Sequence, residues 1–158
     1  LLGNYQLSLQ FIAVFQLLPL IIMKFILPHD ASGNPNRNLK IISILTSICL
    51  TGLIILVAPL VIPILFEGFT HVVELIQILS LSLIPLSVST IYTSQLLGAE
   101  KSKTVIIGSI ISFVTSILGI IILGNIFGII GITVSYVLAT SVLCVFFLII
   151  DLKKRNFN

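Results

Sequence analysis

The sequence has few charged residues: eight Lys or Arg and five Asp or Glu among 158 residues, or 8%. A water-soluble domain carries about 25% charged residues, which it needs to cover its surface. This shortage excludes a water-soluble enzyme and a nucleic-acid-binding protein, and the 58% hydrophobic content excludes intrinsic disorder. With a mean hydropathy of +1.28, the composition predicts an integral membrane protein.

Cysteine and catalytic motifs are also scarce. Cys49 and Cys144 both lie in apolar runs, where they are expected to be small core residues; a disulfide would require that they happen to meet. No GxSxG, phosphate-loop or dinucleotide motif occurs. His29 and His71 fall on opposite sides of the membrane in the topology predicted below, so they cannot share a metal. We therefore expect no enzyme activity, no cofactor and no metal site.

Long uncharged runs locate the membrane spans, because about 20 apolar residues cross the hydrocarbon core of a bilayer. The 47 residues from 104 to 150 carry no charge, and a run of this length is too long for one span. The break is expected at Gly124-Asn125-Ile126-Phe127-Gly128, because glycine and asparagine commonly end helices. We predict an all-α bundle of five spans and a tail at 151–158: residues 7–27, 40–66, 72–97, 104–123 and 129–150.

The positive charges of the connecting segments predict the orientation. Lys and Arg near the four successive connections number 3, 0, 2 and 0, and the tail carries 3. Such residues favour the cytoplasmic side. We therefore expect a multi-pass protein of the cytoplasmic membrane with a cytoplasmic C-terminus. The outward N-terminus, together with a start at Leu1 without Met or signal-peptide features, leads us to expect a piece of a longer protein.

The third span is the most polar. Ser82, Ser89 and Thr93 lie on one side of it, and Pro85 predicts a kink. Five residues share an opposite arc of about 140°: Gln77, Ser80, Ser87, Thr90 and Ser94. They are candidates for lining a substrate cavity; the alternative is hydrogen bonding between helices.

Two charged residues and two stripes of small residues complete the candidate sites. Lys24 is expected to reach the cytoplasmic interface and Glu74 to lie at the outer boundary, with ligand binding by Lys24 and proton coupling by Glu74 as alternatives. Small residues let membrane helices approach closely. The fourth and fifth spans are therefore expected to pack as a hairpin through these residues: Gly108, Ser112, Ser116, Gly131 and Ser135.

The order of the helix-end patterns resembles the C-terminal half of a polysaccharide flippase (O-antigen or lipid-linked oligosaccharide), a family of the multidrug/oligosaccharidyl-lipid/polysaccharide exporter superfamily. Gly3-Asn4-Tyr5 is similar to that family's G-x-Y helix start, and Leu97-Gly98-Ala99-Glu100-Lys101 to its G-x-x-K loop. The segments 59–69 and 128–133 are similar to its P-x-I-I-x-L-L-F-G and Y-G-I-x-G-A-A segments.

The resemblance implies a twelve-helix transporter of two bundles that moves lipid-linked sugars by alternating access. The five spans would be its last five helices, and the implied partners are the bilayer, the N-terminal half and a lipid-linked oligosaccharide. An exporter of drugs or other small molecules from the same superfamily and an accessory structural membrane subunit are the alternatives.

Overall fold

The computed structural model of the chain describes residues 37–65 and 72–156. Before them it describes single helical positions: Gln6, Leu9, Gln10, Ala13, Val14, Gln16, Leu17, Leu20, Ile21 and Lys24. The span predicted at 7–27 therefore lies mostly outside the described residues. The described part is almost entirely helical, which confirms the all-α prediction.

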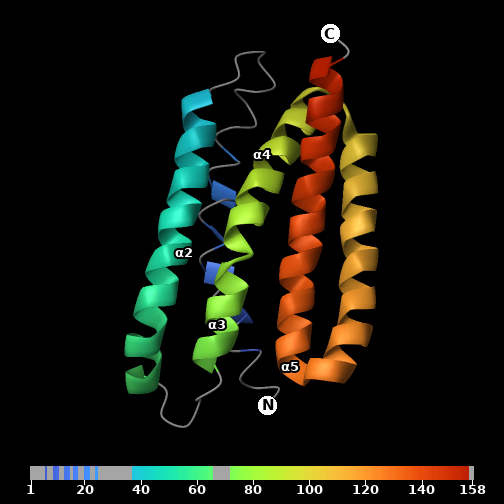
Figure 1. Cartoon of the computed structure of the whole chain (residues 1–158). Helices are drawn as coiled ribbons and strands as arrows, with labels where there is room; N and C mark the ends of the chain where they lie inside the picture. The colour runs from blue at the N-terminus through green and yellow to red at the C-terminus, as the bar shows by residue number, and fades with distance from the viewer. Residues whose placement is uncertain are drawn as a thin grey trace.

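The described helices run back and forth along one bundle. They are α2 (Arg37–Leu65), α3 (Val72–Ser80), α4 (Leu83–Gly98) and α5 (Ser102–Asn156). The start of α2, the connection from α4 to α5 and the end of α5 lie at one end of the bundle (Figure 1). The end of α2, the start of α3 and the reversal within α5 lie at the opposite end (Figure 1). The described helix ends next to Arg37 and Lys40, and next to Lys101 and Lys103, thus share one end of the bundle.

Three helical stretches in the described part are long and apolar enough to cross a membrane: Lys40–Pro63, Val72–Gly98 and Ser102–Leu152. Their outer faces carry large apolar side chains, such as Leu56 at 72% exposed and Phe113 at 65%. Such a surface is unfavourable in water and is what a lipid environment requires. The structure therefore agrees with the membrane location that the composition predicts.

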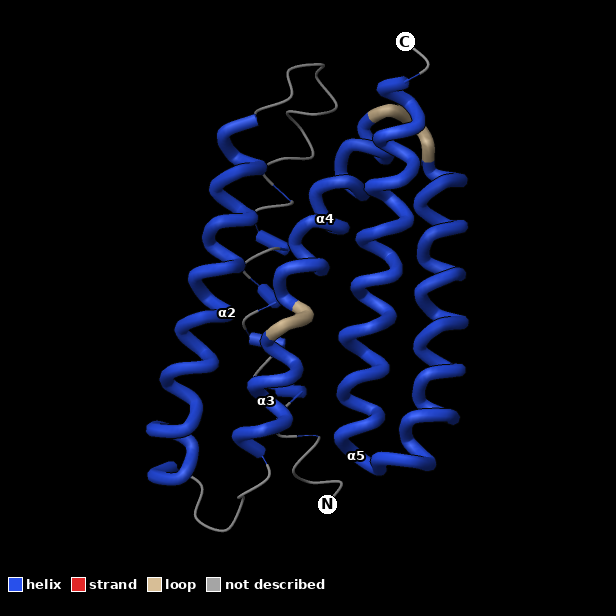
Figure 2. Tube along the Cα trace, viewed as in Figure 1, coloured by secondary structure: helices blue, strands red, loops and turns tan. Residues whose placement is uncertain are grey.

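The stretch from 72 to 98 is broken by a tight turn at Leu81 and Ser82, which separates α3 from α4 (Figure 2). Ser82 N donates to the carbonyl of Leu79 over 2.9 Å, three residues back instead of four. Proline lacks the N–H that would bond four residues back, and its ring crowds that carbonyl. Pro85 thus accounts for the break, which lies one turn before the proline itself.

Helix α5 reverses at Gly128, where φ is 60° and ψ is −130°, a conformation open mainly to glycine. The segments before and after it lie side by side and antiparallel (Figure 1). The reversal falls at the last residue of the predicted break, because the first segment stays helical through Phe127 and does not end at 123.

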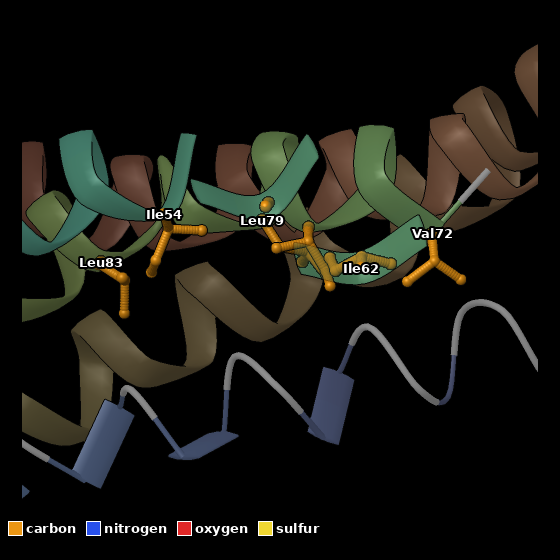
Figure 3. Close-up of a cluster of buried hydrophobic side chains, with 7 residues drawn as sticks. Ile54, Ile62, Val72, Leu79 and Leu83 are labelled. Atoms are coloured by element: carbon orange, nitrogen blue, oxygen red, sulfur yellow. The ribbon is translucent and has the colours of Figure 1, made fainter. Parts of the chain in front are cut away.

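Helix α2 buries a single stripe of residues spaced three or four apart: Ser43, Ser47, Thr51, Ile54, Ala58 and Ile62. The first half of this stripe is polar and the second half is apolar. In the apolar half, Ile54 and Ile62 pack with Val72 and Leu79 of α3 and Leu83 of α4 (Figure 3). The bundle therefore has a hydrophobic core toward the end where α2 meets α3, and a polar contact beyond it.

Candidate functional site: a polar seam inside the bundle

The polar contact is made by hydroxyl side chains that are at most 4% exposed. We call it the polar seam: Ser43, Ser47 and Thr51 of α2 with Ser80 and Ser87 of the broken stretch. Serine and threonine are usually exposed, so five of them buried along one contact is unusual.

Direct hydrogen bonds join the two sides of the polar seam. The Oγ atoms of Ser47 and Ser87 lie 2.5 Å apart, and either can donate. Thr51 Oγ1 lies 3.1 Å from the carbonyl of Ser80 and 2.8 Å from that of Ser47 in its own helix, and its one proton can be donated to either. Ser47 Oγ and Ser87 Oγ also lie 2.9 and 2.8 Å from carbonyls one turn back in their own helices. The two hydroxyls supply two protons for these three contacts, so one carbonyl contact is given up whenever the serine pair is bonded.

The side chain of Gln77 reaches α2 and bonds a backbone carbonyl that lacks its usual donor because of a proline. Its Nε2 donates to the carbonyl of Ile55 over 3.0 Å. In a regular helix that carbonyl would accept from the N–H of residue 59, but residue 59 is Pro59, which has none. Neighbouring helices commonly satisfy such groups in membrane proteins, and Gln77 does so for α2.

The other two members of the predicted arc, Thr90 and Ser94, do not take part in the bonds to α2 described above. Thr90 is half-buried, and its Oγ1 donates to the carbonyl of Leu86 over 2.7 Å within α4. Ser94 is fully buried, and among the described residues its Oγ has no hydrogen-bond partner. Gln77 and Ser87 thus make side-chain hydrogen bonds between helices, which was the alternative expectation. Ser80 takes part only through its backbone carbonyl, since its hydroxyl donates to the carbonyl of Gln77 in its own helix. A cavity-lining role stays a prediction.

The opposite side of the broken stretch is buried as well. Ser82 and Ser89 are 0% and 2% exposed, and each donates to a carbonyl three residues back. Both α3 and α4 contact α2 and α5, so the stretch from 72 to 98 lies between these two helices (Figure 1).

The two charged candidates lie away from the polar seam. Lys24 and Glu74 are both exposed. Their expected interfacial positions stay predictions, as do the alternatives of ligand binding by Lys24 and proton coupling by Glu74. Within the described residues, no three His, Cys, Asp or Glu side chains gather where they could hold a metal.

The predicted small-residue stripes meet across the hairpin of α5. Ser112 Oγ donates to the carbonyl of Ala139 over 2.9 Å. A Cβ on Gly108 would lie 2.8 Å from the ring of Phe147, and a Cβ on Gly131 would collide with the carbonyl of Leu123. Ser135 is buried and lies against Gly119, whereas Ser116 is half-buried.

Sequence reasoning missed the α2 side of the polar seam. Ser43, Ser47 and Thr51 follow one another at intervals of four residues in an otherwise apolar span, which is the spacing of one helix face. That periodicity was the available signal. It shows which residues share a face, but not that the face meets Ser80 and Ser87.

Comparison with known proteins adds no assignment: no protein-family model, curated protein or solved structure matches the chain.

Proposed function

We propose that the chain is the C-terminal part of a membrane flippase that moves lipid-linked oligosaccharide or polysaccharide precursors across the cytoplasmic membrane by alternating access. The proposal includes the five-span topology with a cytoplasmic C-terminus and a twelve-helix protein completed by an N-terminal half. Transport of this kind requires no catalytic residue, cofactor or metal in this part of the protein.

The observation that carries the proposal is the broken helix inside the bundle. The turn at Leu81 and Ser82 lies well inside the apolar stretch from 72 to 98, beside the polar seam. Transporters use discontinuous helices at such depths, because an interrupted helix places polar groups where a substrate must pass. Polar residues within a span are costly in lipid, so their presence indicates a functional site.

The positions of the flippase-like segments give further support. The segment resembling the G-x-x-K loop forms the turn from α4 to α5, where Glu100 has a φ of 57°. The segment that begins at Gly128 starts at the reversal of α5. Both therefore lie at helix ends, as the resemblance implies.

The proposal is tested in the full-length protein, in cells whose own flippase has been deleted. Expression should restore outward movement of the lipid-linked oligosaccharide, which otherwise accumulates on the inner leaflet. Efflux of cationic dyes without this rescue would favour the small-molecule exporter, and neither activity would favour the accessory subunit.

A matched pair of variants tests the predicted cavity. Thr90 and Val88 are both half-buried on α4 and lie about 200° apart around the helix. Thr90→Trp should block translocation and Val88→Trp should be milder, at equal membrane abundance. Ser87 is unsuitable for this purpose because it is fully buried against Ser47, where a tryptophan would test packing. Equal transport by both variants would remove the cavity assignment.

A further inference from the structure

A pocket lies between the C-terminal ends of α4 and α5, away from the polar seam. Its walls include Tyr92, Gln95 and Leu96 of α4, Lys101 of the following turn, and Phe147 and Asp151 of α5. The free volume is about 100 Å³. Since a single water needs roughly 10–15 Å³ on this measure, several waters or one small polar headgroup would fit.

The pocket lies where two uncharged stretches of the chain end, which is where we expect a bilayer to change from hydrocarbon to headgroups. Lys101 follows the end of α4 at Gly98, and Asp151 directly follows the uncharged run that ends at residue 150. The end of α4 and the end of α5 lie at the same end of the bundle (Figure 1). Tyrosine is also typical of this interfacial layer.

The lining combines one positive and one negative side chain with an apolar wall. Lys101 supplies an ammonium group, Asp151 supplies a carboxylate, and Leu96 and Phe147 contribute apolar surface. A ligand that matches this set carries both charges on a small headgroup and an attached hydrocarbon chain.

We propose that this pocket binds phosphatidylethanolamine from the surrounding leaflet. The lipid phosphate accepts hydrogen bonds from the Lys101 ammonium, and the lipid ammonium donates to the Asp151 carboxylate. Charge-assisted hydrogen bonds of this kind are stronger than neutral ones. Phosphatidylcholine carries the same charges but no N–H donor, and phosphatidylglycerol brings no cation for Asp151, so both fit less well. The inference does not depend on what the protein transports.

The test is lipid binding to the purified chain in detergent, measured by native mass spectrometry with three lipids of identical acyl chains. Phosphatidylethanolamine should bind about tenfold more tightly than phosphatidylcholine, a difference expected for one charge-assisted hydrogen bond. Asp151→Asn should remove most of this preference, because Asp151 accepts from the N–H donors that phosphatidylcholine lacks. Lys101→Gln should weaken the binding of both lipids, because both carry the phosphate that Lys101 contacts. Lys103→Gln is the matched control, because Lys103 is exposed two residues away and does not line the pocket.

A second measurement needs no variant and therefore does not depend on how the variants fold. Monomethyl and dimethyl phosphatidylethanolamine remove the N–H donors one at a time, and affinity should fall stepwise toward that of phosphatidylcholine. Tighter binding of phosphatidylglycerol than phosphatidylethanolamine would overturn the proposal in favour of a site for anionic lipids. Equal binding of all three lipids, or equal losses in Lys101→Gln and Lys103→Gln, would also overturn it.

Discussion

The hydrogen bond from Gln77 to α2 can be tested through the proline that makes it necessary. Gln77→Met keeps the length of the side chain but removes its donors. The Ile55 carbonyl then loses the 3.0 Å contact and has no replacement from Pro59. The variant should therefore be less stable, even though it places a more apolar side chain in a membrane bundle.

The expected size follows from the surroundings of the bond. A buried polar group left unsatisfied costs about 1–3 kcal/mol, whereas interhelical hydrogen bonds in membrane proteins average about 0.6 and reach about 1.7 kcal/mol. Gln77 is only half-buried, so we expect Gln77→Met to lower the free energy of unfolding by about 1 kcal/mol.

Pro59→Ala supplies the missing partner from within α2. Its N–H can bond the Ile55 carbonyl, and Pro59 is exposed, so its replacement leaves no buried gap. In this background, Gln77→Met should cost less than half as much. The measurement is a double-mutant cycle from unfolding of the chain in mixed micelles titrated with a denaturing detergent. The same loss in both backgrounds would refute the assignment.

Three further predictions concern the hairpin of α5 and the topology. Gly131→Ala should destabilise the chain by about 1–3 kcal/mol, because the new Cβ meets backbone atoms that cannot move aside cheaply; Gly52→Ala, with nothing within 4 Å, is the control in the same unfolding assay. Gly128→Ala should cost about 1–3 kcal/mol through its φ of 60° alone, since that position is also open. In a cysteine-free background, a Cys probe at Ser102 should be labelled from the cytoplasm and one at Phe127 from outside; labelling of both from one side would contradict the proposed topology.

Local chemistry made several parts of the fold predictable. The long uncharged runs predicted apolar helices, and Gly124 to Gly128 marked the region of the reversal. Pro85 predicted a bend in the third stretch, although the break lies one turn earlier because a proline affects the carbonyl four residues before it. Each of these features depends on residues close together in the chain.

The partners of the polar residues were not predictable in the same way. Periodicity placed Gln77 and Ser87 on one arc, but Ile55 and Ser47 are 22 and 40 residues away in the sequence. Which helix covers an arc depends on the packing of the whole bundle. Likewise, Lys101 and Asp151 lie on different helix ends and line one pocket only because α5 doubles back.

The polar seam also fixes how far α2 can move along its neighbours. Between two uniformly apolar helix faces, a slide of one helical turn, about 5.4 Å, would change the contact energy little. Apolar side chains pack about equally well in either alignment. Here such a slide would break the contact of Ser47 with Ser87 and carry Thr51 away from the Ser80 carbonyl. These hydrogen bonds oppose sliding of α2 along α3 and α4. In a conformational change, the three helices would therefore move together as one rigid body. In any rocking motion of the bundle, helices would then slide past one another at an interface other than the contact of α2 with α3 and α4.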